Sequence, residues 1–316
     1  MSKKVFLSGV QPSGKPHIGN YFGAMKQFVE LQEEYEGYVI IVDYHALHSL
    51  RNPKEMRENI IAVLLDFLAI GLDPTQVTIF KQSDISEHTE LTWIFDTVTT
   101  MPYLMRAHAF KDAEAKNKEI DVGTFNYPVL MASDILLYSP DLVPVGADQK
   151  QHVEICRDIA DKFNNTYGKT FKLPEPTILK DVAVVLGTDG QKMSKSYGNT
   201  IPLFATHEEI KKAVMSIVTD SSGKLPQNVY AIHKLVRPEG ELKKIYEEKK
   251  GSYKELKEIL IEDLEKFIAP LRERRKEFEK DIPKALAILK AGGEKAKKIT
   301  GAKMREVRDK IGVNIY

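Results

Sequence analysis

The sequence predicts an α/β protein with a doubly wound parallel sheet and a C-terminal all-helical domain, on three observations. Short β-branched runs alternate with helical periods through the first 200 residues. From about residue 205 the strand signals give way to helices rich in Lys and Glu. The length of 316 residues favours two domains, at about 150 residues per domain.

The expected elements follow from local patterns. An apolar run at 5–7 indicates a first strand, and an apolar stripe at 18–29 has the period of a helix. The continuous run 38–42 is typical of a strand buried on both faces of a parallel sheet. Asn52 and Pro53 suit the cap and first residue of a helix. Further strands are expected at 77–80, 142–145 and 182–186, and further helices at 208–218, 241–250, 253–276 and 294–311.

The composition excludes several classes of protein. The hydrophobic share is 42% and the charged share 29%, which is typical of a globular chain and not of a disordered one. No apolar run reaches the roughly 18 residues of a membrane span, and the apolar start is too short for a signal peptide. The single Cys156 excludes an intrachain disulfide and a cysteine-cluster metal site, and it favours the cytoplasm.

A polar loop with several glycines, residues 9–20, joins the first strand to the first helix. In an open α/β sheet, ligands bind at this end of the strands, and a helix N-terminus favours a phosphate. Gly19 lets another group pack closely on the helix. His17 and Asn20 lie three residues apart, so they share one side of the first turn. Alone, the segment is also compatible with a turn that has capping residues.

A second polar loop follows the expected strand at 182–186. It carries Lys192, Ser194, Lys195 and Ser196 beside a glycine. Lysines supply compact positive charge, so the loop suits the binding of phosphates whose charge grows during a reaction. An ordinary loop of Lys and Ser is the alternative.

Taken together, HIGN at 17–20 and KMSKS at 192–196 resemble the two signatures of class I aminoacyl-tRNA synthetases. The resemblance implies a Rossmann-type catalytic domain, ATP as substrate, Mg²⁺ bound with its phosphates, and tRNA as partner. The implied catalytic residues are His17, Asn20, Lys192, Ser194 and Lys195. The implied ATP-binding residues are Gln11, Pro12, Ser13, Gly19, Asn20, Gly146, Ala147, Asp148, Val185, Lys192, Met193, Ser194, Lys195 and Ser196.

A carboxylate within an apolar helix is the next informative feature. Pro128 suits a first helical turn, and Tyr127, Met131 and Asp134 then lie on one helix face. A buried Asp134 needs a partner. Either it binds nearby backbone or a lysine, or it accepts one hydrogen bond deep in an apolar amino-acid pocket.

Class I synthetases for tyrosine and tryptophan share this layout. The tyrosine enzymes usually have Gln at the position of Met131, so the segment YPVLMASD resembles the bacterial tryptophanyl-tRNA synthetases. The resemblance spans about residues 5–220. It implies that Asp134 accepts the indole N–H of L-tryptophan, which ATP activates for transfer to tRNA(Trp), releasing pyrophosphate and AMP. The implied tryptophan-binding residues are Leu7, Gly9, His45, Tyr127, Met131, Asp134, Val143, Val145 and Gln149.

Two positions depart from the family pattern and keep alternatives open. Leu7 replaces the usual Phe, and Ala147 replaces a Glu that contacts the ATP ribose. The alternatives are a tyrosyl-tRNA synthetase and a regulatory paralogue that binds tryptophan or ATP without charging tRNA. No metal site is expected, because six further histidines have no metal-ligand spacing. They are His48, His88, His108, His152, His207 and His233.

The resemblance implies three parts of the chain. Residues 1–200 form the catalytic domain, and 201–295 form a helical domain that binds the tRNA anticodon region. Residues 296–316 form a terminal helix that could pack back on the first domain. Basic residues outnumber acidic ones after residue 241, although the whole chain has a net charge of +1. The cluster of Arg272, Arg274, Arg275 and Lys276 is expected to face tRNA or solvent, and a homodimer is implied.

Overall fold

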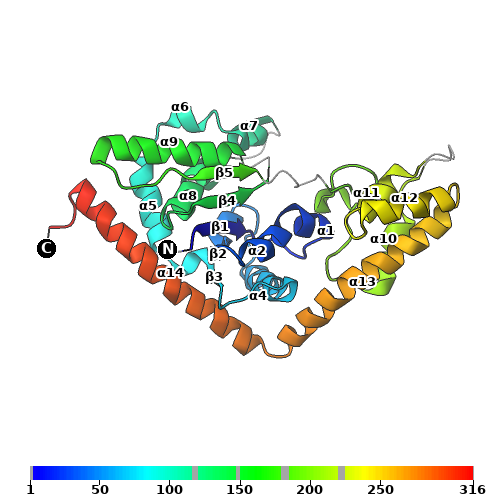
Figure 1. Ribbon diagram of the computed structural model, residues 1–316. Helices are drawn as coiled ribbons and strands as arrows, with labels where there is room; N and C mark the ends of the chain where they lie inside the picture. The colour runs from blue at the N-terminus through cyan, green and yellow to red at the C-terminus, as the bar shows by residue number, and fades with distance from the viewer. Residues whose placement is uncertain (1–2, 116–119, 147–149, 179–184, 220–224, 316) are drawn as a thin grey trace.

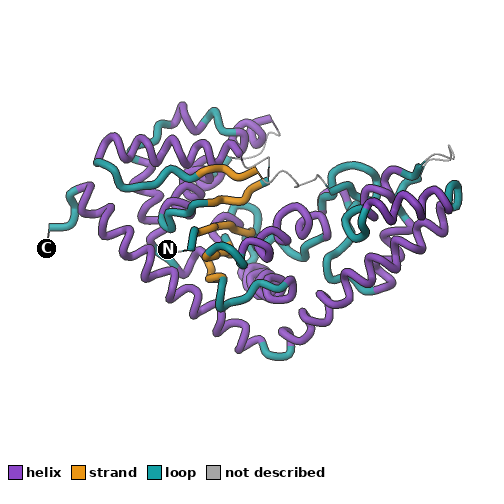
Figure 2. Tube along the Cα trace, in the orientation of Figure 1, coloured by secondary structure: helices purple, strands orange, loops and turns teal. Residues whose placement is uncertain are grey.

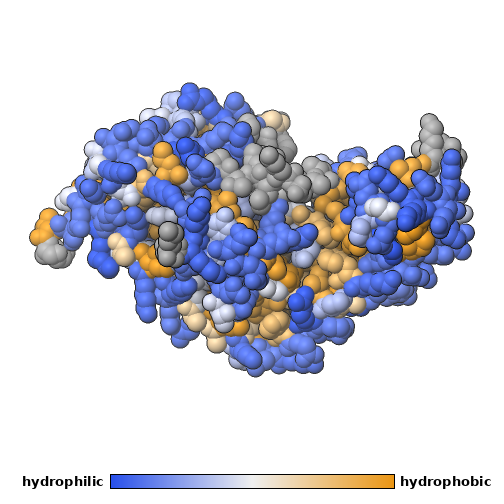
Figure 3. All heavy atoms as spheres, in the orientation of Figure 1, coloured by the Kyte–Doolittle hydropathy of each residue, from blue (hydrophilic) through white to orange (hydrophobic). Residues whose placement is uncertain are grey.

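A computed structural model describes residues 3–115, 120–146, 150–178, 185–219 and 225–315. A parallel sheet lies at the centre of the N-terminal part, and a helical part extends from it (Figures 1 and 2). The face of the molecule in Figure 3 is mostly hydrophilic, with apolar residues gathered where the two parts meet. Within the described residues, no helix is both long and apolar enough to cross a membrane.

Five parallel strands form the sheet in the order β3-β2-β1-β4-β5. Their bounds are Val5–Val10 (β1), Glu36–Ile41 (β2), Val77–Lys81 (β3), Leu142–Val145 (β4) and Glu175–Ile178 (β5). The strand order reverses between β1 and β4, which is where open sheets of this kind bind ligands. The expected doubly wound sheet is therefore confirmed.

Two of the expected strand positions need comment. Strand β5 was not expected, because it is short, lies at the sheet edge and contains Pro176, which cannot donate to a ladder. The strand expected at 182–186 falls mostly on residues 182–184, which lie outside the described residues. Of its remaining residues, Leu186 forms an isolated bridge with Lys192.

Side chains alternate between two hydrophobic cores on opposite faces of the sheet. Phe6 and Val39 belong to the first core, whereas their neighbours Leu7 and Ile40 belong to the second. This alternation follows from the two-residue period of a strand. A sheet buried on both faces explains the continuous apolar runs in the sequence.

The helices of the N-terminal part cover both faces. Their bounds are Ile18–Asn20 (α1), Tyr21–Met25 (the π-helix η1), Lys26–Leu31 (α2), Asp43–Ala46 (α3), Pro53–Ile70 (α4), Gln82–Asp84 (the 3-10 helix η2), Glu87–Asp96 (α5), Met101–Leu104 (α6), His108–Ala115 (α7), Val122–Leu136 (α8) and Lys150–Tyr167 (α9). Helix α4 begins as expected, because the Asn52 side chain accepts from the Lys54 and Glu55 amides, and it ends at Gly71, which is left-handed with φ 104°.

Helix α8 differs from the expectation for Pro128. This residue lies inside the helix and not in its first turn. The helix begins earlier because the Asp121 side chain accepts a hydrogen bond from the Thr124 amide and caps the first turn. Tyr127, Met131 and Asp134 still lie along one helix face, at the spacing that the sequence predicts.

The C-terminal part is helical, as expected. Its helices are Lys195–Tyr197 (the 3-10 helix η4), His207–Met215 (α10), Gln227–His233 (α11), Glu239–Glu248 (α12), Tyr253–Glu279 (α13) and Ile282–Ile311 (α14). Helices α13 and α14 form a V along one side of the molecule (Figure 1). Helix α14 is continuous across residues 295–296, where a domain boundary was expected, and it packs against β3.

Candidate active site

Two adjoining cavities open at the carboxyl end of the sheet, between β1 and β4. The larger has a volume of about 740 Å³ and lies between the two signature loops. The smaller, of about 290 Å³, extends beside β1 and α8. Val10, Ala24 and Gly146 line both cavities, so one ligand can reach from one into the other.

Most of the predicted ATP-binding residues line the larger cavity. Those that do are Gln11, Ser13, His17, Gly19, Asn20, Gly146, Val185, Lys192, Met193, Ser194 and Lys195. Pro12 is buried beside the cavity without lining it. Ser196 is exposed and exchanges a 2.9 Å hydrogen bond with Ser194 instead. Ala147 and Asp148 lie outside the described residues.

His17 and Asn20 fix the start of the helix that follows β1. The Asn20 amide donates to His17 Nδ1 at 3.2 Å, and the His17 amide donates to Asn20 Oδ1 at 3.0 Å. This reciprocal cap uses the three-residue spacing that the sequence shows. Burial and the charge of Lys195 lower the pKa of His17 to about 4. The imidazole is therefore neutral at neutral pH.

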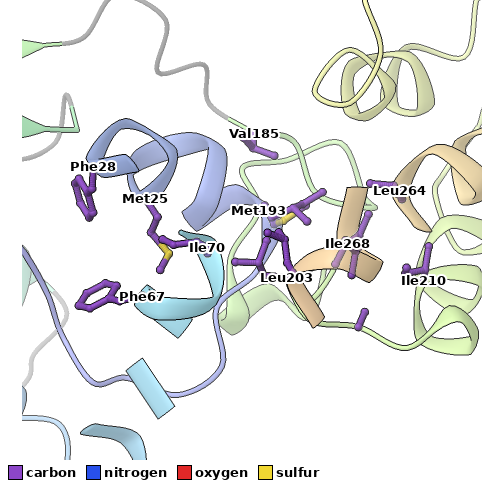
Figure 4. Packing of buried hydrophobic residues seen from close by; sticks show 14 of the residues in the cluster. Met25, Phe28, Phe67, Ile70, Val185, Met193, Leu203, Ile210, Leu264 and Ile268 are labelled. Carbon is purple, nitrogen blue, oxygen red and sulfur yellow. The ribbon is translucent and has the colours of Figure 1, made fainter. Parts of the chain in front are cut away.

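Gly19 and Met193 bring the two signatures into contact. A Cβ on Gly19 would lie 2.8 Å from His17 Nδ1 and 3.3 Å from Met193 Cβ, so only glycine fits without displacing a neighbour. Met193 is buried in the first core with Val185, Leu203 and Ile268 (Figure 4). The second signature loop is thus anchored in the core by its methionine, and its lysines remain at the cavity.

The side chain of Asn199 forms hydrogen bonds that hold the second signature loop in one conformation. Its Nδ2 donates to Asp189 Oδ1 at 2.7 Å and to the Lys192 carbonyl at 3.2 Å, and its Oδ1 accepts from the Ser194 amide at 2.8 Å. The side chain is buried. A buried amide whose donor and acceptor are both used stabilises one loop conformation. This role of Asn199 was not predicted, because its partners are backbone groups and the carboxylate of Asp189, which is 10 residues away.

The larger cavity is also lined by a carboxylate that was not among the predicted site residues. Asp66 on α4 lines the cavity, is nearly fully buried, and accepts from Arg275 Nε at 2.6 Å. Burial raises the pKa of Asp66 to about 6, although Arg275 and Lys195 lower it. The signal in the sequence was an Asp within the apolar run of helix 53–70.

The smaller cavity is mostly apolar and ends at a carboxylate. Seven of the predicted tryptophan-binding residues line it: Leu7, Gly9, His45, Tyr127, Met131, Asp134 and Val143. Val145 ends β4. Gln149 lies outside the described residues.

Asp134 accepts hydrogen bonds from three buried side chains. His45 Nε2 lies 2.8 Å from Oδ2, and Gln82 Nε2 lies 2.8 Å from Oδ1 and 3.0 Å from Oδ2. His88 Nδ1 also contacts Oδ1. Burial alone would raise the pKa of Asp134, but His88 and His45 hold it well below its usual range. The carboxylate is therefore ionised inside an apolar cavity.

His45 and Tyr127 lie together at the wall of the smaller cavity. Their ring centroids are 4.3 Å apart, and His45 Nε2 is turned toward Asp134. His45 Nδ1 is buried and has no hydrogen-bond partner in the described part of the chain. The expectation that His45 lies near the substrate carboxylate stays a prediction. Gln82 and His88 were missed, because their partner Asp134 is 52 and 46 residues away.

Three of the four residues in the basic cluster on α13 form ion pairs with other residues of the chain, and the expectation that the cluster faces tRNA or solvent stays a prediction. Arg272 pairs with Glu265 at 2.6 Å, Arg275 pairs with Asp66, and Lys276 pairs with Glu273 at 2.9 Å. Only Arg274 of the four has no ion pair with the described residues. The pair between Arg275 and Asp66 joins α13 to α4, so it connects the helical part to a helix of the N-terminal part.

Comparison with known proteins agrees with this geometry. Residues 2–276 match the family described as tRNA synthetases class I (W and Y), and the chain belongs to this family. A tryptophan–tRNA ligase from Fusobacterium nucleatum is 49% identical over 321 residues, which cover 98% of this chain and 99% of that protein. Family and fold are thus as the sequence predicts.

Solved structures give the same result. Tryptophanyl-tRNA synthetase from Campylobacter jejuni, complexed with ADP and tryptophan, has a TM-score of 0.91 and 43% identity, covering 98% of this chain and 99% of that chain. Tyrosyl-tRNA synthetase from Archaeoglobus fulgidus, at 21% identity and a TM-score of 0.67, covers 87% of this chain and 90% of that one. The second likeness concerns the fold alone.

Proposed function

We propose that the chain is a tryptophan–tRNA ligase that activates L-tryptophan with ATP and transfers it to the 3′ adenosine of tRNA(Trp). The observation that supports this most is the pair of adjoining cavities. One is lined by both signature loops, and the other is apolar and ends at the ionised Asp134. Curated relatives of nearly the same length carry the same function by name.

The smaller cavity favours tryptophan over tyrosine. Its deep polar group is a carboxylate, which accepts a hydrogen bond from an indole N–H as it would from a phenol O–H, so the preference depends on the rest of the cavity wall. Met131 lines the same wall and is soft enough to pack on an indole ring.

In the first step the tryptophan carboxylate attacks the α-phosphate of ATP, and pyrophosphate leaves. A carboxylate is already a nucleophile, so no general base is needed, and catalysis consists of positioning and charge stabilisation. Lys192 and Lys195 line the cavity where the phosphates would lie, and they would stabilise the charge on the departing pyrophosphate. Mg²⁺ would arrive on the ATP phosphates and add positive charge there.

In the second step a ribose hydroxyl of the tRNA attacks the mixed anhydride, and AMP leaves. We assign residues 1–200 to the catalytic domain, 201–295 to tRNA anticodon binding and 296–316 to a terminal segment on the catalytic domain. Helix α14 supports the last assignment, because it packs against β3. We place the reaction in the cytoplasm, as the single cysteine predicts.

We also propose a homodimer. Trp93 is 72% exposed, Val122 is 80% exposed, and Met101 and Met105 are exposed as well. They lie on or beside α5, α6 and α8, and both α5 and α6 pack against α8. Large exposed apolar side chains that gather on one region mark an interaction surface. Light scattering should give twice the chain mass for the wild type and a lower mass for Trp93→Glu.

The whole reaction is tested by charging tRNA(Trp) transcript with radiolabelled tryptophan in the presence of ATP. The expected result is radioactivity that precipitates with the tRNA in acid and that depends on ATP and on tryptophan. A matched transcript of tRNA(Tyr) with labelled tyrosine is the control. Charging of tRNA(Tyr) alone would overturn the proposal, and so would label on neither tRNA.

A further inference from the structure

A buried series of hydrogen bonds connects the smaller cavity to the second core. Asp134 lines the cavity, whereas His88 and Tyr138 lie behind it among the described residues. His88 is 0% exposed, its Nδ1 contacts Asp134 Oδ1, and its Nε2 lies 2.9 Å from the Tyr138 hydroxyl. None of the proposed reaction steps uses His88.

The direction of these hydrogen bonds follows from the chemistry of each group. An ionised carboxylate only accepts, so His88 Nδ1 carries the proton and donates to Asp134. In the tautomer with its proton on Nδ1, the Nε2 atom is an acceptor, and the Tyr138 hydroxyl donates to it. Tyr138 thus fixes the tautomer of His88, and His88 fixes one oxygen of Asp134.

The other donors to Asp134 are placed differently. Gln82 contacts both carboxylate oxygens, and its own Oε1 accepts from the Tyr44 and His45 amides. His45 lines the cavity, so its hydrogen bond lies on the side from which a ligand enters. A carboxylate has about four lone-pair sites, and the four contacts fill them. An incoming indole N–H must therefore replace one contact, and only His45 is on the cavity side.

We propose that His88 is a positioning residue that keeps Asp134 ionised and oriented toward the indole N–H, and thereby sets the preference for an amino acid that carries this N–H. The proposal rests on the proposed function and concerns its specificity. When the indole N–H replaces the hydrogen bond from His45, His88 and Gln82 remain as the donors that stabilise the buried charge of Asp134. A charge-assisted hydrogen bond of this kind is about twice as strong as a neutral one.

Two variants, His88→Asn and His88→Gln, each retain one of the two contacts of His88, with Asp134 or with Tyr138. In His88→Asn the side-chain N–H group replaces Nδ1 and can still donate to Asp134. In His88→Gln the amide lies near the former Nε2, so the contact with Tyr138 is retained and the contact with Asp134 is lost. Both substitutions place a neutral amide in the same buried site, so each serves as the control for the other.

The readout is amino-acid-dependent ATP–pyrophosphate exchange with tryptophan and with the analogue in which sulfur replaces the indole N–H. We expect wild type to prefer tryptophan in kcat/KM, and His88→Asn to keep that preference within about 3-fold. His88→Gln should lose about 10-fold or more of it, since a hydrogen bond to a charged group is lost. Exchange with the analogue should change little.

Several results would overturn the proposal. They are an unchanged preference in His88→Gln, an equal loss with both amino acids, and a wild type that does not distinguish them. If circular dichroism shows that both variants are unfolded, Tyr138→Phe decides, because it removes only the hydroxyl that fixes the His88 tautomer. A reduced tryptophan preference in Tyr138→Phe supports the role of His88, and an unchanged one contradicts it. Absence of any tryptophan-dependent exchange in wild type would instead contradict the proposed function.

Discussion

Lys195 Nζ donates a 2.9 Å hydrogen bond to the backbone carbonyl of Ser13, although the two residues are 182 positions apart. Ser13 belongs to the loop after β1, and Lys195 belongs to the loop that contains Met193. Both residues line the larger cavity. Partial burial lowers the pKa of Lys195, and Asp66 opposes this change. The ammonium group is thus present at the cavity before any phosphate arrives.

Lys195→Ala should slow adenylate formation far more than it weakens tryptophan binding. The lysine acts on charge that develops as pyrophosphate leaves, and loss of one such preorganised group costs on the order of 10²–10³ in rate. Pre-steady-state adenylate formation and equilibrium tryptophan binding measure the two quantities. Lys211→Ala, on the exposed face of α10, is the matched control. Equal losses in rate and in binding would exclude a role in the transition state.

Asp134→Asn should weaken the selection of tryptophan over phenylalanine by about 10- to 100-fold, since one hydrogen bond to a charged group is lost. The measurement is kcat/KM for exchange with each amino acid. Met131→Leu changes the same cavity wall at nearly constant volume and should leave the selection largely intact. An Asp134→Asn variant as selective as wild type would show that the indole N–H binds elsewhere.

His17 should make the free energy of unfolding fall as the pH is lowered. Its pKa is lowered to about 4 by burial and by Lys195, whereas an unfolded histidine keeps its ordinary value of 6.5. Between these values the unfolded chain binds a proton that the folded chain does not, so acid favours unfolding across this window. Urea unfolding at pH 7 and at pH 4.5 should give a loss larger in wild type than in His17→Asn, by on the order of 2 kcal/mol. Asn retains a helix cap, so equal losses in the two proteins would contradict the lowered pKa.

Arg275→Leu should destabilise the protein by about 3–5 kcal/mol, because Asp66 then remains buried without its partner. The double variant Asp66→Leu with Arg275→Leu should recover much of this loss, since no buried charge is then left without a partner. Urea unfolding followed by circular dichroism measures both. Arg274→Leu, one residue earlier and exposed, should change the free energy of unfolding by less than about 0.5 kcal/mol. Additive effects of the two leucines would argue against the pair.

Gly292→Ala should separate α14 from β3 locally. A Cβ at Gly292 would lie 1.9 Å from the carbonyl oxygen of Ile79, and backbone cannot move away as a side chain can. We expect a loss of about 1–3 kcal/mol or more in the free energy of unfolding. Gly240→Ala, in α12 with open space around it, should instead stabilise by about 0.5–1 kcal/mol. A neutral Gly292→Ala would contradict the close approach of helix and strand.

Local patterns were enough to predict most of the fold. The runs at 38–42 and 77–80 predicted β2 and β3, and Asn52 with Pro53 marked the start of α4. Strand β5 could not be predicted, because its Pro176 and its length of four residues hide the strand pattern. Pro128 predicted the start of the helix wrongly. The helix begins at Val122, because the cap at Asp121 outweighs the preference of proline for a first turn.

The candidate site was predictable where a motif carries the chemistry and not where partners come from distant segments. The two signature loops and the spacing of Tyr127, Met131 and Asp134 are local features. The partners of Asp134, in contrast, come from three other segments of the chain. Arg275 likewise pairs with a carboxylate 209 residues away, so its sequence neighbours indicated only a basic cluster.

Activation of tryptophan by this chain is tested by ATP–pyrophosphate exchange without tRNA, run separately with tryptophan and with tyrosine. We expect exchange with tryptophan and not with tyrosine, because Met131, where the tyrosine enzymes usually have Gln, lines the wall of the amino-acid cavity that ends at Asp134. Exchange with tyrosine alone would contradict the assignment of that cavity. Exchange with neither amino acid would indicate a paralogue that binds these ligands without activating them.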